Sequence, residues 1–209
     1  MPDIKIGKIT LGMAMTNTYF VYREGIKDCI VFDPADKGEW LFQKLSDNGF
    51  EVKAIFLTHG HFDHIWGVEE LAKLSGAEVY AAKEEEKLLS DPKMNVSASC
   101  GRPCSVNPGH LLKDGEEVRI ADITIRMIET PGHTGGSCCF YLEEAGFLIA
   151  GDTIFCESVG RTDLPTGSMS TLIRSINEKL MTLPDETRVY PGHGEATTIA
   201  HEREYNPFL

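Results

Sequence analysis

The sequence lacks a long hydrophobic run. None of its 209 residues belongs to a stretch that approaches the roughly 18 consecutive apolar residues of a membrane span. Its start also lacks the basic segment and following apolar segment of a secretory signal, which favours a cytoplasmic protein. Internal repeats, low-complexity tracts and long linkers are absent. We therefore expect residues 1–209 to form one globular domain outside the membrane.

Positive charge is scarce. The sequence has 20 lysines and arginines against 32 aspartates and glutamates, which gives a net charge of −12. Such a surface repels phosphate backbones and anionic lipid headgroups. Nucleic acids and membrane surfaces are therefore not expected as partners.

Cysteine is also sparse, with six residues that show no disulfide framework. Cys100 and Cys104 form a C-x3-C pair, but a zinc site needs two more ligands and none is close in sequence. Cys138 and Cys139 are adjacent on an expected strand, so they should point to opposite faces of its sheet. We expect all six cysteines to be free thiols.

Histidine, in contrast, is concentrated in one motif. The segment Thr-His-Gly-His-Phe-Asp-His (residues 58–64) places three imidazoles and a carboxylate directly after an apolar run at residues 52–57. The end of a strand can fan such side chains around one point. Nitrogen and oxygen donors that converge at a point are what a borderline divalent metal needs. The motif therefore predicts one part of a metal centre.

Three more donors stand in turns that follow short β-rich segments. They are His133 in Thr-Pro-Gly-His-Thr-Gly, Asp152 in Gly-Asp-Thr and His193 in Pro-Gly-His-Gly. Glycine lets the backbone turn sharply and approach a ligand closely. His110 and His201 lie outside such turns and are interpreted as structural or surface residues. The sequence thus predicts a metal centre formed by seven side chains: His59, His61, Asp63, His64, His133, Asp152 and His193.

Strands outnumber helices in both halves of the sequence. Helices are expected at residues 37–48, 65–75 and 83–89, from Ser168 or Ser170 to Pro184, and at residues 196–204. Residues 92–111 are expected to form a loop. This order favours an α/β protein with two mixed β-sheets packed face to face and helices outside. The donor-bearing loops should then share one edge of the sandwich.

The ordered donor set resembles the metallo-β-lactamase superfamily, whose fold is an αββα four-layer sandwich. The segments Gly-Asp-Thr-Ile-Phe (151–155), Gly-Arg-Thr-Asp-Leu-Pro (160–165) and Asn-Pro-Phe-Leu (206–209) are similar to its glyoxalase II-like, or hydroxyacylglutathione hydrolase-like, branch in the short bacterial form. One departure is that the C-terminal helical domain of full-length glyoxalase II, which helps to hold glutathione, has no counterpart here.

The resemblance implies two metal sites. The first would use His59, His61 and His133, and the second Asp63, His64 and His193. Asp152 would bridge both. Zinc is the expected metal, with iron or manganese as alternatives. Asp33 and Thr58 are expected to orient the metal-bound histidines.

The resemblance also implies the reaction. The expected enzyme is a hydrolase that cleaves a thioester such as S-lactoylglutathione, with a metal-bridging hydroxide as nucleophile and with Asp63 and Asp152 as catalytic carboxylates. No Gly-x-Ser-x-Gly nucleophile elbow is present. Arg161 would bind a carboxylate of the glutathione moiety. The alternative for Arg161 is a structural pair with Asp163.

Other functions stay open at this point. A persulfide dioxygenase shares the fold but uses one iron, which here would be held by His59, His133 and Asp152. A non-catalytic metal-binding or partner-binding module would be expected to have lost a ligand, and none is lost. A β-lactamase is disfavoured because such enzymes are normally exported.

Overall fold

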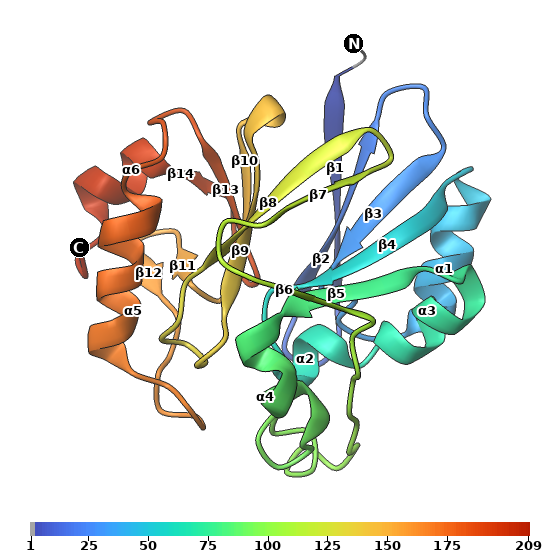
Figure 1. Ribbon diagram of the computed structural model, residues 1–209, viewed down its shortest axis with the longest axis horizontal. Coiled ribbons are helices and arrows are strands. Elements are labelled where there is room, and N and C mark those ends of the chain that lie inside the picture. Colours follow the sequence, from blue (N-terminus) through green and yellow to red (C-terminus); the bar gives the residue numbers. More distant parts are fainter. Residues whose placement is uncertain (1–2) are drawn as a thin grey trace.

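The computed structural model describes residues 3–209, and most of its strands form two six-stranded sheets that face each other (Figure 1). The strands of the first sheet, in spatial order, are β1 (Ile4–Leu11), β2 (Thr16–Arg23), β3 (Asp28–Phe32), β4 (Glu51–Leu57), β5 (Glu78–Ala82) and β6 (His110–Leu112). Those of the second are β14 (Thr197–Thr198), β13 (Arg188–Pro191), β10 (Phe147–Gly151), β9 (Cys138–Leu142), β8 (Ile123–Glu129) and β7 (Glu117–Ile120). A separate hairpin pairs β11 (Ile154–Phe155) with β12 (Ser158–Val159).

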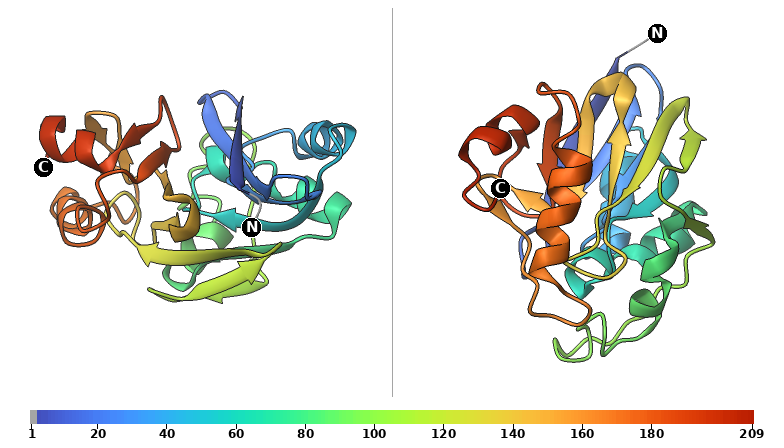
Figure 2. Two further views of the ribbon diagram at one scale, coloured as in Figure 1. Left: turned by 90° about the horizontal axis from the view of Figure 1, so that it is seen from above. Right: turned by 60° about the vertical axis from the view of Figure 1, so that its left-hand side comes forward.

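Helices cover the outer face of each sheet (Figure 2). Next to the first sheet lie α1 (Gly38–Asp47) and α3 (Val68–Ser75), and next to the second lie α5 (Met169–Ser175), its π-helical continuation Ile176–Leu180 and α6 (Ile199–Tyr205). Two short helices, α2 (Phe62–Ile65) and α4 (Glu86–Ser90), lie near the lower edge in Figure 1, and a 3-10 turn (Lys83–Glu85) leads into α4. The expected four-layer αββα sandwich is confirmed. Within residues 3–209, no helix combines the length and apolar character of a bilayer-crossing segment.

The core consists of three apolar layers, one between the sheets and one beneath each helical layer. Between the sheets, Phe32 and Phe56 of the first sheet contact Phe140 of the second, with ring centroids 5.1–5.7 Å apart. Burial of each such ring contributes about 1.5–3 kcal/mol. Cys138 faces this central layer and Cys139 faces the helical layer, as the alternation predicts. Both are buried because both faces of the second sheet are covered.

The two sheets are joined directly at one edge of the sandwich. The N–H of Cys138 donates to the carbonyl of Thr58 over 2.9 Å, and the N–H of Asn17 donates to the carbonyl of Gly192 over 2.7 Å. Strands β3 and β4 run parallel to each other, as do β10 and β13. Strand β8 runs in the same direction as β10, since both are antiparallel to β9. The turns that follow β3, β4, β8, β10 and β13 therefore share this edge, and they carry the predicted donors.

Two helix predictions were wrong in detail. The helix expected at residues 65–75 is interrupted before α3, because Gly67 packs against the backbone of Pro34 and Asp36 and donates its N–H to the carbonyl of Pro34. The helix expected from residue 196 begins at Ile199, since Thr197 and Thr198 pair with β13 instead. The Thr198 hydroxyl then caps α6 by accepting the N–H of His201.

Candidate metal centre

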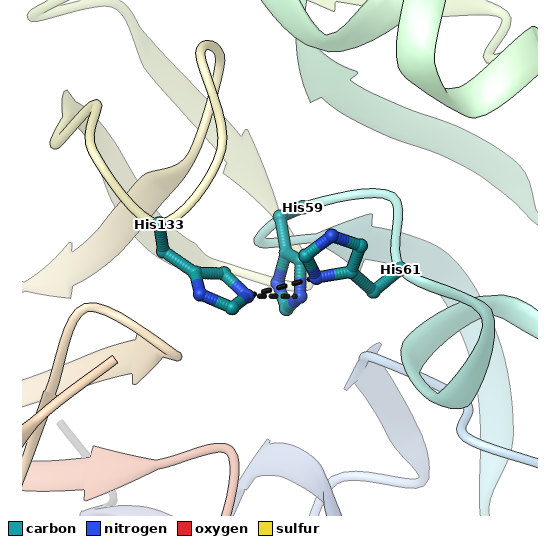
Figure 3. Close-up of side chains that lie close together, drawn as sticks. All are labelled: His59, His61 and His133. Atoms are coloured by element: carbon teal, nitrogen blue, oxygen red, sulfur yellow. Dashed lines mark hydrogen bonds between the residues drawn. The ribbon is translucent and has the colours of Figure 1, made fainter. Parts of the chain in front are cut away.

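Three imidazoles converge at the edge where the sheets meet (Figure 3). His59 and His61 follow β4 of the first sheet, and His133 follows β8 of the second. His133 Nε2 lies 2.8 Å from His61 Nδ1 and 3.2 Å from His59 Nε2. All three side chains are at most 3% exposed. We refer to His59, His61 and His133 as the three-histidine group.

Neighbouring polar atoms assign the protons of two of these rings. The Thr58 hydroxyl donates to Asp33 Oδ2 over 2.6 Å, so its oxygen accepts the N–H at His59 Nδ1 over 3.1 Å. His133 Nδ1 donates to the backbone carbonyl of Arg161 over 2.7 Å. The Nε2 lone pairs of both rings are therefore directed at the point of convergence.

Burial keeps the three-histidine group uncharged. It lowers the pKa of His59 well below its usual value and that of His61 to about 3. Burial also lowers the pKa of His133, although Asp152 opposes that shift. At neutral pH the group thus presents neutral nitrogen donors.

A second cluster, richer in negative charge, lies beside the first. It consists of Asp63 and His64 on α2 and His193 after β13, and we call it the mixed group. Asp63 Oδ2 is 3.3 Å from His193 Nε2 and 3.7 Å from His64 Nε2. The Thr16 hydroxyl holds the same oxygen of Asp63 over 2.9 Å, and Asp33 Oδ2 accepts from His64 Nδ1 over 2.9 Å.

Carboxylates give the mixed group protonation properties opposite to those of the three-histidine group. Burial alone would lower the pKa of His193, but hydrogen bonds to Asp152 and Asp63 raise it to about 9. The pKa of His64 is also raised, because the nearby carboxylates outweigh its burial. Burial would raise the pKa of Asp63, yet His64 and His193 lower it to about 2.

Asp152, which follows β10, lies between the two groups. Its Oδ2 is 3.7 Å from His133 Nε2 and 3.4 Å from His193 Nε2, and its Oδ1 is 3.4 Å from His64 Nε2. Gly192 has no side chain at this point, and a Cβ there would collide with Asp152 Oδ1. The glycine of the Pro-Gly-His-Gly turn therefore allows the His193 loop to lie directly against the carboxylate.

The cluster contains buried nitrogen and oxygen atoms that lack hydrogen-bond partners and could bind a metal instead. Among the described residues 3–209, His64 Nε2 and Asp152 Oδ1 are buried without a hydrogen-bond partner, even though they are 3.4 Å apart. Buried polar atoms nearly always have a partner. The donors are imidazoles and carboxylates with no thiolate, a set that suits divalent cations. Among residues 3–209, four sets have ligand atoms within 4.8 Å of one another. Three belong to this cluster: His59, His61 and His133; His59, His64 and Asp152; and Asp63, His64 and His193. The fourth, Cys156, His201 and Glu202, includes none of the seven predicted ligands.

All seven residues that the sequence predicted as metal ligands thus surround one small volume. His110 and His201 lie apart from it and contact Glu78 and Glu157, respectively, at 3.0 Å. All six cysteines are free thiols. Cys100 and Cys104 belong to none of the potential metal clusters in residues 3–209.

A pocket of about 430 Å³ opens above the cluster. Metal-centre residues form its floor, and Phe62, Phe155, Val159 and Leu164 form apolar parts of its wall. Arg161 lies at the pocket with a side chain that is 63% exposed. Its guanidinium makes two 2.7 Å hydrogen bonds to Asp163, so the structural pair that the sequence left open is present.

Several residues that orient the cluster were not found from sequence. The carbonyl of Arg161 holds His133, the hydroxyl of Thr16 holds Asp63, and the buried carboxylate of Glu85 contacts the backbone of both histidine-bearing loops. Asp33, which was expected to orient a histidine, contacts His64 directly and His59 through Thr58. A backbone carbonyl leaves no signal in a sequence, and Glu85 belongs to a run of three glutamates.

Comparison with known proteins agrees with the fold and the cluster. Residues 11–193 match the model of the metallo-beta-lactamase superfamily, and the chain belongs to this superfamily. A probable metallo-hydrolase of Bacillus subtilis, YqgX, is 36% identical over 99% of this chain and 98% of its own. Together with the similarity described next, this supports a metal-dependent hydrolase.

Two further similarities concern the branch of the superfamily and the fold. The hydroxyacylglutathione hydrolase GloC of Haemophilus influenzae is 33% identical over 88% of both chains, which supports a glyoxalase II-like branch. The crystal structure of the B3 metallo-beta-lactamase BLEG-1 superimposes with a TM-score of 0.93 at 38% identity, over 98% of this chain and 99% of that one.

Proposed function

We propose that this metallo-hydrolase cleaves thioesters and that its preferred substrates are glutathione conjugates such as S-lactoylglutathione. The observation that carries the proposal is the pair of adjacent donor groups joined by Asp152 in the floor of the pocket. Two donor groups that share one carboxylate suit two cations that share one reaction centre. In this proposal the chain acts as a single catalytic domain.

The seven clustered residues would hold two divalent cations, for which zinc is our proposal. The three-histidine group would bind the first and the mixed group the second, with Asp152 between them. Bound cations of this kind lower the pKa of water and polarise a carbonyl oxygen. No serine or cysteine nucleophile is needed.

The side chains of the protein would position the reacting water. Asp63 has a pKa of about 2 and is held by Thr16, so it stays ionised and oriented at the pocket floor. An ionised carboxylate next to the reacting water can accept a hydrogen bond from it and so orient it. Asp63 and Asp152 are therefore the proposed catalytic carboxylates.

The pocket wall suits the rest of such a substrate. Apolar side chains such as Phe155 and Leu164 can contact the carbon chain next to a thioester. Arg161 can exchange its contact with Asp163 for a carboxylate of the glutathione moiety, since exposed ion pairs contribute only about 0–1 kcal/mol. The similarity to GloC supports this substrate class.

One competing activity is favoured by a specific observation, the similarity to BLEG-1, whose description names a B3 metallo-beta-lactamase. β-Lactam and thioester hydrolysis both attack an acyl carbon, and the same metal centre could serve either. Direct comparison of the two substrate types is therefore part of the test.

The test uses purified protein of known metal content and three assays. S-Lactoylglutathione hydrolysis should be fast with two zinc ions per chain, while a β-lactam should be turned over at least ~100-fold less efficiently, a ratio within the range of specific active sites. Oxygen uptake with glutathione persulfide should be absent. Efficient β-lactam hydrolysis, or oxygen uptake by protein with one iron, would refute the proposal.

A further inference from the structure

Glu85 is a buried carboxylate between the two loops that carry the three-histidine group. It ends the 3-10 turn before α4, and its side chain is 1% exposed. Glu85 Oε1 accepts the N–H of Gly60, the residue between His59 and His61, over 2.9 Å. Glu85 Oε2 accepts the N–H of Gly136 over 2.9 Å.

The loop after His133 makes a further contact with the same carboxylate. The Thr134 hydroxyl lies 2.8 Å from Glu85 Oε1 and 3.0 Å from Oε2, and it also lies 2.6 Å from the Ser137 hydroxyl. Ser137 can donate to Thr134, which donates to Glu85. Gly136 is pressed so closely against the turn that a Cβ there would collide with the backbone of residues 84 and 85.

The hydrogen bonds of Glu85 require an acceptor. Gly60 and Gly136 offer backbone N–H groups, which only donate, and each oxygen of the Glu85 carboxylate can accept one of them. Burial raises the pKa of Glu85 to about 7, and the hydrogen bonds from Gly60, Thr134 and Gly136 oppose that shift. A buried carboxylate is costly unless donors surround it, and here each oxygen has one backbone donor. An amide of the same shape would turn an NH2 group toward one N–H and leave that donor unsatisfied.

We propose that Glu85 is a positioning residue for the three-histidine group, because its carboxylate joins the loop of His59 and His61 to the loop of His133. The two loops come from different sheets, so their separation sets where the three nitrogens meet. The mixed group is held by other contacts, from Thr16 and Asp33. The inference rests on the proposed metal centre and extends it to one residue that touches no proposed ligand side chain.

The test is zinc binding to Glu85→Gln, measured without substrate by competition with a chromophoric chelator. A His193→Ala background leaves the three-histidine group intact, and a His61→Ala background leaves the mixed group intact. In the first background Glu85→Gln should weaken zinc binding about 10–100-fold, the usual effect of losing a contact that orients ligands. In the His61→Ala background, Glu85→Gln should change zinc affinity less than about threefold.

Glu202→Gln is the matched control. Glu202 is also a fully buried carboxylate, and it accepts from Thr197 Oγ1 at 2.6 Å, Asn206 Nδ2 at 2.8 Å and the N–H of Glu157 at 2.9 Å. It contacts neither histidine-bearing loop. Loss of a buried carboxylate is common to both variants, so Glu202→Gln should lower the melting temperature. It should leave the zinc affinities of the three-histidine group and of the mixed group unchanged, because Glu202 belongs to a different set of potential ligands, with Cys156 and His201.

Equal zinc affinities of Glu85→Gln and wild type in the His193→Ala background would overturn the proposal, and so would equal losses in both backgrounds. If Glu85→Gln does not fold, Thr134→Val gives the same test. It should lower zinc affinity several-fold in the three-histidine group and leave the zinc affinity of the mixed group unchanged. Failure of the thioesterase proposal is distinguishable, because it would appear as wild-type zinc binding without thioester turnover.

Discussion

The three-histidine group and the mixed group lie side by side but hold protons in opposite ways. Burial among other imidazoles keeps the first group neutral, with the pKa of His61 lowered to about 3. In the second, Asp63 and Asp152 raise the pKa of His193 to about 9. In the metal-free protein at neutral pH, the three-histidine group directs unprotonated nitrogens at one point, whereas histidines of the mixed group hold protons. Both groups contain histidine, so the surrounding charge, rather than the residue type, determines the protonation state.

This difference gives Asp152 a particular importance, since within residues 3–209 it is the one carboxylate with distances below 4 Å to histidines of both groups. It supplies negative charge to the mixed group and an oxygen to the three-histidine group. A variant at this position should therefore affect both, whereas variants on either side should affect one.

The largest effect is expected for Asp152→Ala. It should reduce zinc content below one equivalent per chain and lower thioester turnover by at least ~10³-fold, the scale of losing a main electrostatic group in an active site. Elemental analysis and a turnover assay would measure both. Asp152→Asn, which keeps the shape, serves as the companion variant; two tightly bound zinc ions in Asp152→Ala would contradict the bridging position.

A pH series should separate the two groups. The mixed group must release the protons of His193 and His64 to bind zinc, because the pKa of each is raised, so its affinity should rise at least tenfold per pH unit from pH 6.5 toward about 9. The three-histidine group should show little change in that range, because the pKa values of its histidines are lowered. Zinc titrations of the His61→Ala and His193→Ala proteins would measure each separately, and parallel pH profiles would contradict the comparison.

The same shift predicts the stability of the metal-free protein. The pKa of His193 is 6.5 ordinarily and about 9 in the folded state, so the folded state binds the proton more tightly. Its contribution to the free energy of unfolding is complete below pH 6.5 and is lost as the pH rises through about 9. Chelator-treated protein should thus become less stable over this range, and His193→Ala should flatten the dependence measured by urea unfolding.

A pair of buried threonines offers a finer comparison. Thr58→Val removes the oxygen that accepts from His59, and Thr16→Val removes the donor to Asp63. Each should weaken zinc binding about tenfold, the first in the three-histidine group and the second in the mixed group. The two substitutions are identical and both sites are buried, so they can be compared directly. If Thr58→Val weakened zinc binding only in the mixed group, or Thr16→Val only in the three-histidine group, these contacts would not orient the ligands.

The smallest effect is expected at the mouth of the pocket. Arg161→Ala should raise the KM for glutathione thioesters several-fold and change kcat little, since an exposed guanidinium contributes mainly to binding. Asp163→Ala is the matched variant, because it frees the guanidinium and should lower KM. An unchanged KM in Arg161→Ala would leave Arg161 with only its structural pair and its carbonyl contact to His133.

The sequence predicted the sandwich and the seven clustered residues because both depend on local patterns. Each donor follows a β-rich segment in a turn that contains glycine or a second donor, and parallel strands bring such turns to one edge. The contacts that orient the donors depend on long-range packing instead. Thr16 lies 47 residues from Asp63 in the chain and contacts it only because β2 starts at the same edge.

Glu85 illustrates the limit most clearly. It is one of three consecutive glutamates between lysines, a pattern typical of an exposed helical turn. Its neighbours Glu84 and Glu86 are exposed, while Glu85 is buried beneath the histidine-bearing loops. No local property of the sequence distinguishes the three glutamates. Glu85 differs from the other two because the loop at Gly136 packs against it. The break before α3 has a similar origin, in the contact between Gly67 and Pro34.

The central claim is that two cations share this cluster, and anomalous diffraction from crystals of the zinc-loaded protein at the zinc edge tests it most directly. Two peaks are expected, one among the nitrogens of the three-histidine group and one within the mixed group, with Asp152 between them. A single peak, or zinc bound elsewhere on the chain, would contradict it.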